Sequence, residues 1–297
     1  MKQYKVAAII VTYNRDEYLK DLIENLLLQS YPVEKIIVID NANSEIINDY
    51  KINKDKIIYH KNNKNEGCSK GFKKGLEIAL ELDVELFWLF DDDVVPQNTA
   101  LEELIKIYHN NEVIQPIRIN LKNEIVEISC LEFDLKSILR NNPRKYEIRN
   151  IFKNLDKIPN KLEIADFTFE GVLIPKTIVV KVGLPNPNFF IFCDDTEYAL
   201  RIRKAGYKIY LIKNSVIFRK LEYKNKIDDW KEYFLNRNMY YLYKFYGENK
   251  IIKIKPFVHF FLKIFKLIFR LQFKRIKRLF YSFYDFMKKE YPIRIIE

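Results

Sequence analysis

The chain has 297 residues, of which 48% are apolar, so it can bury one large α/β core or two smaller ones. Cys68, Cys130 and Cys193 lie far apart and form no CxxC pair, so neither a zinc site nor a disulfide framework is predicted, and a reducing, cytosolic compartment is expected. The net charge is +11, and residues 250–297 carry 13 Lys/Arg against 3 Asp/Glu, so almost all of the excess lies at the C-terminal end.

The N-terminal residues do not have the pattern of a targeting segment. An apolar run at residues 6–11 is too short for the hydrophobic region of a signal peptide, and no small-residue cleavage site follows it. The chain also contains no stretch of 18 uncharged apolar residues. We therefore expect a buried first strand and no membrane-spanning helix.

The first 120 residues alternate short apolar runs with amphipathic helical runs, as the βαβ units of a mostly parallel sheet do. Strands are predicted at residues 5–11, 35–39, 57–59 and 85–90. A helix follows the turn at residues 13–15, with Asp16 placed to cap it, and a second helix ends near residue 81. Thr99 and Glu102 have the spacing of a capping box for a third helix.

The second half of the chain is less regular. Residues 122–160 show no firm period, and strand signals resume at residues 164–175. A helix is predicted at residues 195–205, ended by Gly206, and two short strands are predicted at residues 207–212 and 215–218.

Three adjacent carboxylates, Asp91, Asp92 and Asp93, follow the predicted strand 85–90. Neighbouring like charges repel, and a divalent metal between Asp91 and Asp93 would relieve that repulsion through oxygen ligands. A solvated acidic turn is the alternative. Ligands of open α/β sheets bind at the carboxyl ends of strands, where Thr12, Asp40 and Asp91 would gather.

A Gly-bearing loop lies at residues 65–71, with the sequence NEGCSKG. It lacks the spacing of a P-loop or a dinucleotide-binding fingerprint, so the loop alone is as consistent with an ordinary turn as with a phosphate-binding loop. Beside the acidic triplet, its backbone amides and Lys70 are candidates for contact with a diphosphate.

A second acidic cluster, Asp194, Asp195 and Glu197, follows an apolar run and opens a predicted helix. Acidic residues favour helix N-termini, each by about 0.3–1 kcal/mol, so a simple helix cap is one interpretation. Two clusters at two element ends suggest a division of labour instead, with one set on a metal and one carboxylate acting as general base.

Taken together, these segments resemble family 2 glycosyltransferases of GT-A fold, in the branch that contains rhamnosyl- and galactofuranosyltransferases. The matching motifs occur in the expected order over about residues 5–246. They are VTYNR at 11–15, VIDNAN at 38–43, NEG at 65–67, FDDDVVP at 90–96, GVLIP at 171–175 and FFIFCDDTEYALR at 189–201.

The resemblance implies roles for individual residues. Those expected at the nucleotide and diphosphate are Thr12, Tyr13, Asn14, Arg15, Asp40, Asn65, Gly67, Lys70, Asp91 and Asp92. Asp93, with Asp91, would bind Mg²⁺ or Mn²⁺. Asp195 would be the base that takes the acceptor's proton, and Asp194 and Glu197 would shape the acceptor site. The segment YFLNRN at 233–238 resembles an aromatic and Arg-Asn segment of the same branch.

The chain departs from the family at one position. Members often place a metal-binding His after the strand that contains Val216 and Ile217, and here Phe218, Arg219 and Lys220 follow. Either Asp93 holds the metal with phosphates and water, or the affinity for metal is low.

The basic tail is predicted as an amphipathic helix that starts at Pro256. Cations recur on it at spacings of 3, 4, 4 and 3, at Lys263, Lys266, Arg270, Lys274 and Lys277. With the aromatic and aliphatic residues between them, this pattern predicts binding to a membrane surface through residues 256–284, because anionic lipids attract each cation by about 1 kcal/mol. A helix packed on the catalytic domain, or a dimer contact, is the alternative.

The sequence thus predicts a mixed, mostly parallel GT-A sheet in residues 1–249, followed by a helical membrane-binding tail at 250–297. The expected reaction is inverting transfer of a sugar from a UDP- or dTDP-linked donor, of galactofuranose or rhamnose type, to a hydroxyl of a lipid-linked or surface-polysaccharide glycan. The enzyme is expected in the cytoplasm, on the inner face of the cell membrane.

Two other functions are weighed against this one. A sugar nucleotidyltransferase would normally carry a Gly-rich loop after the first strand, and residues 12–15 contain no Gly. A nucleic-acid-binding protein is suggested only by the basic tail, and the Phe-rich face of that tail disfavours it.

Overall fold

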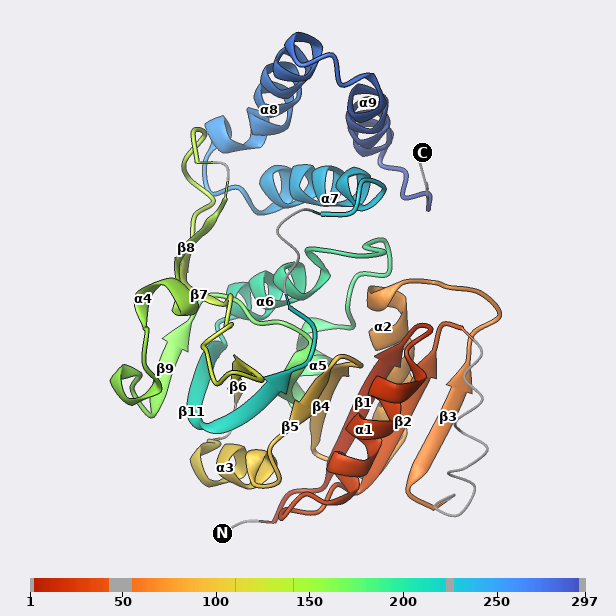
Figure 1. The fold of residues 1–297 in the computed structure, drawn as a ribbon, viewed down its shortest axis with the longest axis vertical. Coiled ribbons are helices and arrows are strands. Elements are labelled where there is room, and N and C mark those ends of the chain that lie inside the picture. The colour runs from red at the N-terminus through yellow and green to blue at the C-terminus, as the bar shows by residue number, and fades with distance from the viewer. Residues whose placement is uncertain (1–2, 43–54, 110, 141, 223–226, 294–297) are drawn as a thin grey trace.

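The computed structural model describes residues 3–42, 55–109, 111–140, 142–222 and 227–293. Within these ranges, one sheet of nine strands is flanked by helices (Figure 1). Its order is β3-β2-β1-β4-β10-β6-β11-β5, with β9 paired to β11. The strands span Val6–Thr12 (β1), Lys35–Asp40 (β2), Ile57–Lys61 (β3), Leu86–Asp91 (β4), Val94–Pro96 (β5), Glu112–Asn120 (β6), Lys161–Ile164 (β9), Glu170–Pro175 (β10) and Lys208–Arg219 (β11).

The sheet confirms the predicted mixed, mostly parallel α/β fold. β3, β2, β1 and β4 are parallel to one another, and β6 is parallel to β11. β10 runs antiparallel to β4 and β6, between the two parallel groups. The first four strands lie within two residues of the predicted ranges, whereas the two strands predicted at 207–218 are one strand, β11, with a register shift between Ile212 and Val216.

Alternate side chains of each central strand face two separate cores, because successive residues of a strand point to opposite faces. Ile9 packs with Phe72 of α2 (Cys68–Leu80), in the core shared with α5 (Lys176–Val182) and α6 (Asp194–Lys204). Ile10 packs with Leu22 of α1 (Asp16–Leu27), in the core shared with α3 (Ala100–Ile107). Both faces of the sheet are therefore buried, and its polar chemistry is confined to the strand ends.

Neither predicted helix cap forms a side-chain hydrogen bond. Asp16 is the first residue of α1, preceded by Arg15 at the cap position, and no side chain caps this end. Thr99 occupies the predicted cap position of α3, but its side chain makes no capping bond, and Glu102 accepts from Ser30 Oγ and pairs with Lys106 instead of completing the capping box.

Residues 122–160, which lacked a clear period, form small elements at the side of the sheet. β7 (Cys130–Phe133) and β8 (Arg144–Glu147) pair as an antiparallel hairpin, followed by the short helix α4 (Ile148–Ile151) and the 3₁₀ turn η2 (Leu155–Lys157). Elements of four residues are too short for a hydrophobic period to be recognised in the sequence.

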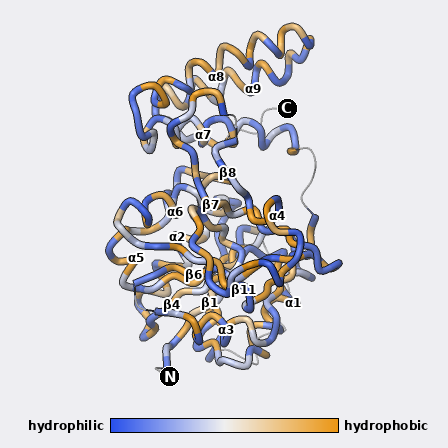
Figure 2. The backbone as a smooth tube through the Cα atoms, turned by 90° about the vertical axis from the view of Figure 1, so that its left-hand side faces the viewer, coloured by the Kyte–Doolittle hydropathy of each residue, from blue (hydrophilic) through white to orange (hydrophobic). Residues whose placement is uncertain are grey.

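Three helices form a separate layer at one end of the molecule (Figure 1). α7 (Lys231–Tyr246) packs against the sheet domain, and α8 (Lys250–Phe269) and α9 (Phe273–Lys288) form a hairpin that packs on α7 through a cluster of Tyr240, Phe260, Leu267 and Leu279. The two helices of the hairpin lie side by side in Figure 2 as well.

The single helix predicted from Pro256 is therefore wrong. α8 starts six residues earlier, at Lys250, where the side chain of Asn249 accepts a hydrogen bond from the Ile252 amide at 2.8 Å. The chain breaks between α8 and α9 at Leu271, which adopts φ 51°. Among the described residues, no helix is long and apolar enough to cross a membrane. The division at residue 249 stays a prediction, and residues 43 and 294–297 of the predicted segments lie outside the described ranges.

Candidate active site

The loop after β1 is organised around one buried carboxylate, Asp92. Thr12 Oγ1 donates to Asp92 Oδ2 at 2.7 Å, and the Tyr13 amide donates to the same oxygen at 3.3 Å. Arg15 Nη1 donates to Asp92 Oδ1 at 2.7 Å. Asn14 between them has φ 53°, a conformation that Asn tolerates better than most residues. The structure thus brings together four residues predicted for the nucleotide pocket, and Asp92 holds the loop in place.

The ends of β2 and the Gly-bearing loop meet next to this one. Asp40 is fully buried, and its carboxylate accepts from the Ala42 amide at 2.7 Å and from the Tyr59 hydroxyl at 2.6 Å. Asn41, which was not singled out in the sequence, donates from Nδ2 to the Gly67 carbonyl at 3.2 Å. Two loops that are 26 residues apart in the chain are joined in this way.

Gly67 occupies a position that only glycine fits. Its φ is +85°, and an added Cβ would lie 2.3 Å from the Phe190 carbonyl oxygen. Asn65 Oδ1 accepts from the Gly67 amide at 2.9 Å. Lys70 is half-exposed and lies 3.5 Å from Glu66 across a turn of helix. Gly67 therefore allows the close contact with the backbone of Phe190. The role of this segment in binding a diphosphate stays a prediction.

Three carboxylates converge at the end of β4. Oxygens of Asp91, Asp93 and Glu170 all lie within 4.8 Å of one another. Mg²⁺ prefers oxygen ligands at about 2.0–2.1 Å, so ligand oxygens around one ion are about 3–4 Å apart, and these residues fit a hard divalent cation. Glu170 was missed in the sequence, because it comes from β10, which pairs with β4 in the folded chain.

The electrostatics of this cluster favour a cation. Burial, followed by the charges of Asp93 and Glu170, raises the pKa of Asp91 well above its usual value. Burial and Glu170 raise the pKa of Asp93 to about 6, although Arg219 and Arg15 oppose the shift. Within the described ranges, no salt bridge reaches Asp91. A bound divalent cation would favour the ionised carboxylates.

Two arginines neutralise part of the negative charge of this carboxylate cluster. Arg118 is fully buried and pairs with Glu127 at 2.6 Å and Glu170 at 2.7 Å. Arg219 lies 3.2 Å from Asp93 Oδ2 through Nη2 and 3.1 Å from Glu170 Oε2 through Nε. The segment that departs from the family pattern therefore brings a guanidinium into the acidic cluster.

The second acidic cluster lies beside the first. Cys68 at the start of α2 directs its thiol to Asp91 Oδ1 at 3.3 Å, and its amide donates to the Phe190 carbonyl oxygen, four residues before Asp194, at 2.9 Å. Asp194 and Asp195 begin α6, directly after Phe192 and Cys193, whose φ values are 66° and 62°. Two successive left-handed residues other than Gly are strained, and such strain is common at functional sites.

The two neighbouring aspartates differ in environment. Asp194 is 6% exposed, and burial followed by the charge of Asp195 raises its pKa to about 7. Asp195 is only half-buried, and its Oδ1 accepts from the Thr196 amide at 2.6 Å. Burial raises the pKa of Asp195 also, and the charge of Arg144 counters this shift. Asp195 is therefore the more accessible carboxylate and Asp194 the more perturbed one.

Arg144 is a further residue that the sequence did not indicate. It comes from β8, donates from Nη2 to Thr196 Oγ1 at 2.8 Å and from Nε to the buried Asp166 at 2.6 Å. It thereby ties the irregular segment 122–160 to the start of α6. A single Arg in a segment without a period gives no signal of such a contact.

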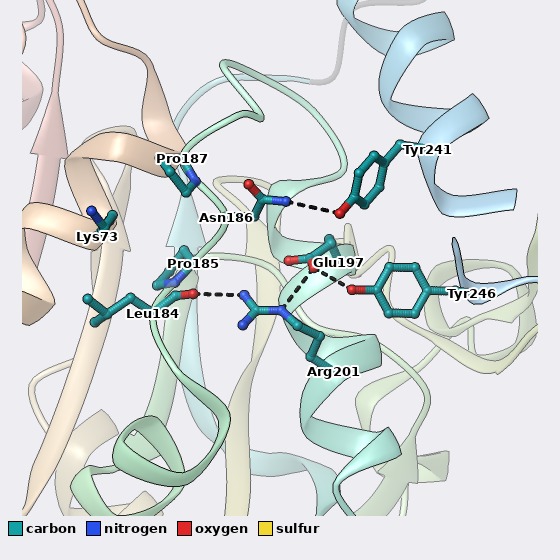
Figure 3. A pocket seen from close by; sticks show the side chains of 9 residues that line it. All are labelled: Lys73, Leu184, Pro185, Asn186, Pro187, Glu197, Arg201, Tyr241 and Tyr246. Atoms are coloured by element: carbon teal, nitrogen blue, oxygen red, sulfur yellow. Dashed lines mark hydrogen bonds and ion pairs between the residues drawn. The ribbon is translucent and has the colours of Figure 1, made fainter. Parts of the chain in front are cut away.

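Glu197 has a more structural environment than expected. Its Oε1 accepts a hydrogen bond from the Tyr246 hydroxyl and lies 2.9 Å from Arg201 Nε. Arg201 also donates to the Leu184 carbonyl at 2.9 Å (Figure 3). These side chains line a cavity of about 440 Å³ with Asn186 and Tyr241. Glu197 holds α6 against the end of α7, and its role at the acceptor stays a prediction.

Comparison with known proteins then decides the family. The family described as "Glycosyl transferase family 2" matches residues 7–161, more than half of the chain. The chain belongs to glycosyl transferase family 2. This family assignment favours glycosyl transfer over nucleotidyl transfer and over nucleic-acid binding.

Curated relatives agree with the assignment. The glycosyltransferase is 28% identical over 207 residues to galactofuranosyltransferase GlfT1 of Mycolicibacterium smegmatis, with 68% of this chain and 66% of that protein covered. It is 28% identical over 218 residues to dTDP-rhamnosyl transferase RfbF of Shigella flexneri, with 70% and 66% covered. A Streptococcus pyogenes hyaluronan synthase matches 37% of this chain at 31% identity. The chain spans about two thirds of the first of these relatives and 28% of the hyaluronan synthase.

Solved structures confirm the GT-A fold. GalNAc-T7 with UDP, GalNAc and Mn²⁺ superposes with a TM-score of 0.61 over 82% of this chain and 48% of that one, at 13% identity. A mannosyltransferase from Pyrobaculum calidifontis with GDP-Man and Mn²⁺ gives a TM-score of 0.57 over 95% of this chain and 74% of that one, at 14% identity. The Asp-rich group of the glycosyltransferase is consistent with a divalent metal as in these structures.

Proposed function

We propose that this family 2 enzyme transfers a sugar from a nucleotide diphosphate donor to an acceptor hydroxyl with inversion at the anomeric carbon. The observation that carries the proposal is the position of Cys68, whose thiol donates to Asp91 Oδ1 at 3.3 Å and whose amide donates to the Phe190 carbonyl, four residues before Asp194, at 2.9 Å, because it joins the two acidic clusters in one site. One side of that site offers oxygen ligands for a cation at the diphosphate. The other side offers carboxylates for proton transfer.

Asp91, Asp93 and Glu170 would hold Mg²⁺ or Mn²⁺, which supplies positive charge for the leaving diphosphate. Asp195 would take the proton of the acceptor hydroxyl on Oδ2, since its Oδ1 is engaged by the Thr196 amide. The acceptor oxygen then forms the new bond to the anomeric carbon while the bond to the diphosphate oxygen breaks. Asp194, which is more deeply buried, would orient the Asp195 carboxylate for this proton transfer.

The donor is proposed to be a UDP- or dTDP-linked sugar of galactofuranose or rhamnose type. The support is the similarity to the galactofuranosyltransferase and the dTDP-rhamnosyl transferase, each over about two thirds of its length. The acceptor is proposed to be a lipid-linked or surface-polysaccharide glycan, reached from the cytoplasmic face of the cell membrane.

The α8–α9 hairpin supports a membrane location. Its far end exposes large apolar side chains: Phe261, Leu262, Phe265, Ile268, Phe269, Leu271 and Phe273 are each at least half exposed. Contiguous exposed apolar surface of this kind marks sites of contact with membranes or other proteins. A lipid interface accepts both the apolar side chains and the cations beside them.

The structure divides the predicted cationic stripe into two groups. Lys263 faces inward, where it contacts Glu232 at 3.1 Å and Asn236 at 2.9 Å, so it fastens α8 to α7. Lys266, Arg270, Lys274 and Lys277 are exposed around the apolar end of the hairpin. The charge of this second group complements anionic lipid headgroups, and we propose that the hairpin inserts its tip at the bilayer surface.

A panel of nucleotide sugars tests the enzymatic proposal most broadly. Purified protein with Mn²⁺ or Mg²⁺ should hydrolyse at least one UDP- or dTDP-linked sugar slowly and should show a rise in Tm with the matching nucleotide diphosphate. Asp93→Ala should abolish the hydrolysis and the metal-dependent part of the Tm rise, while the exposed Asp83→Ala should leave both unchanged. Neither binding nor hydrolysis of any donor by the wild type would overturn the proposal.

A further inference from the structure

We propose that Arg219 is a donor-site residue that holds Asp93 and Glu170 until donor and cation arrive and then contacts the donor diphosphate. This inference rests on the proposed function of the same site. Arg219 ends β11, and its guanidinium bridges two of the three carboxylates that converge there, at 3.2 Å from Asp93 and 3.1 Å from Glu170.

The backbone fixes the base of the Arg219 side chain beside the cluster. Arg219 pairs with Val94 across β11 and β5, and the next amide, of Lys220, donates to the Asp93 carbonyl at 3.0 Å. The Arg219 side chain is 12% exposed, so it reaches the edge of the site rather than the core. Its remaining nitrogen, Nη1, donates to the Leu221 carbonyl oxygen, so Arg219 would have to exchange some of these contacts to reach a ligand.

The charges of the surrounding network show why Arg219 matters. Salt bridges join the acids Asp92, Asp93, Glu127 and Glu170 to the cations Arg15, Arg118 and Arg219, and Asp91 adds a further acid at the same place. Five carboxylates against three guanidinium groups leave a net charge of −2 when all are ionised. One divalent cation would balance that charge.

The three arginines are not equivalent. Arg118 has no exposed surface and is held by Glu127 and Glu170. Arg15 pairs mainly with Asp92, which organises the first loop. Arg219 is the guanidinium that spans two of the expected cation ligands, so a divalent cation at Asp93 would lie close to it and the two positive charges would repel.

Binding of the donor diphosphate would relieve the repulsion between Arg219 and the cation. Guanidinium groups bind phosphate oxygens through paired, charge-assisted hydrogen bonds. When cation and donor bind together, Arg219 can leave Asp93 and take a phosphate oxygen. The cation should therefore bind weakly to the protein alone and strongly with nucleotide diphosphate, and Arg219 should also contribute to nucleotide affinity without any metal.

Two binding measurements test this inference. Binding of Mn²⁺ without nucleotide is followed by the electron paramagnetic resonance signal of free Mn²⁺, and binding of UDP and dTDP in EDTA by calorimetry. Arg219→Gln should bind Mn²⁺ about tenfold more tightly, because the competing charge is gone, and nucleotide in EDTA about tenfold more weakly, through loss of a charged hydrogen bond. The matched control is Lys220→Gln, since the Lys220 side chain pairs with Asp21 and only its backbone amide, which the substitution keeps, meets Asp93.

Unchanged or weaker Mn²⁺ binding by Arg219→Gln would overturn the inference. If that variant is unstable, Arg219→Met carries the test, because Met also removes the competing charge and keeps much of the side-chain length, and its Mn²⁺ affinity must then rise above that of the wild type. A wild-type protein that binds no nucleotide diphosphate would instead overturn the proposed function itself.

Discussion

Asn238 donates from Nδ2 to the carbonyl oxygen of Phe192 at 2.9 Å. The same nitrogen lies 3.0 Å from the Ile191 carbonyl oxygen. Asn238 belongs to α7, and Phe192 and Cys193 are the two residues with positive φ directly before Asp194. A buried side chain from the C-terminal layer thus holds the strained turn that positions the second acidic cluster.

Asn238→Ala should therefore lower turnover more than donor affinity. The substitution removes the donor for two backbone carbonyls, a loss that costs about 1–3 kcal/mol when the carbonyls stay buried, and it lets the turn relax. Asn236→Ala is a matched control, because buried Asn236 on the same helix contacts Lys263 instead of the turn. The test compares the steady-state turnover and donor affinity of the two variants. Equal losses of turnover in both would show that α7 contributes only to stability.

Asp195→Asn should reduce turnover by about 10² to 10⁴, the usual contribution of a general base, with little change in donor affinity. Asp194→Asn should be milder, because Asp194 is more deeply buried and acts through its neighbour. The comparison is made at saturating donor and acceptor. An inactive Asp194→Asn beside a nearly normal Asp195→Asn would reverse the two roles, and two active variants would reduce the cluster to a helix cap.

The buried aspartate pair should make turnover depend on pH. A base must be ionised, and the pKa of Asp194 is raised to about 7 by burial and by Asp195, so the rate should rise through the neutral range as the pair loses its last proton. Asp194→Asn should move this limb to lower pH. A rate that is flat from about pH 5 to pH 8 in the wild type would contradict this prediction.

The same shift has a consequence for stability. An acid whose folded pKa exceeds its unfolded value of 3.8 favours the folded state most at low pH, and this contribution is lost as pH rises from 3.8 to about 7. Asp194→Asn should therefore raise Tm by a few degrees near pH 8 and by less near pH 5. Thermal unfolding at both pH values measures the difference, and a lower Tm near pH 8 would contradict it.

The fold of the first half could be predicted because its strands are buried on both faces and read as apolar runs, as for Val6–Thr12 and Leu86–Asp91. The break in the tail could not. Leu271 adopts positive φ without the Gly or Pro that usually marks such a turn, and the hydrophobic period continues across it.

The candidate active site could also be predicted only in part from the sequence. Asp91 and Asp93 belong to one acidic triplet, and Asp194 and Asp195 are adjacent in the chain, so each of these two clusters was visible in the sequence. Glu170 and Arg219 reach that site only through the antiparallel insertion of β10 and the length of β11. Their partners are more than 40 residues away in the chain, and a single sequence carries no signal of such pairing.

Membrane binding should depend on the exposed cations of the hairpin. Replacing Lys266, Arg270 and Lys274 with Glu should release the protein from anionic vesicles in co-sedimentation, because each exposed cation contributes about 1 kcal/mol. Replacing the exposed Lys157, Lys181 and Lys204 with Glu changes the net charge equally and should leave binding intact. These variants are preferable to truncation after Tyr246, which would expose the apolar face of α7.

Substitution of the apolar tip separates lipid insertion from simple charge attraction. Phe265 and Phe269, 64% and 73% exposed, should be dispensable for folding but needed for vesicle binding at high salt, where electrostatic attraction is screened. Phe265→Ser with Phe269→Ser should therefore lose binding at high salt while Tm stays unchanged. A large fall in Tm would show that these rings stabilise the folded protein.

The anomeric configuration of the transferred sugar tests the central claim most directly. The donor found in the nucleotide-sugar panel is used, and the reaction is followed by proton NMR. Early spectra report the anomeric configuration of the product, and for donor hydrolysis they do so before the released sugar equilibrates between its anomers. Single displacement with Asp195 as base predicts a product whose anomeric configuration is opposite to that of the donor. A product that retains the donor's configuration would contradict the account.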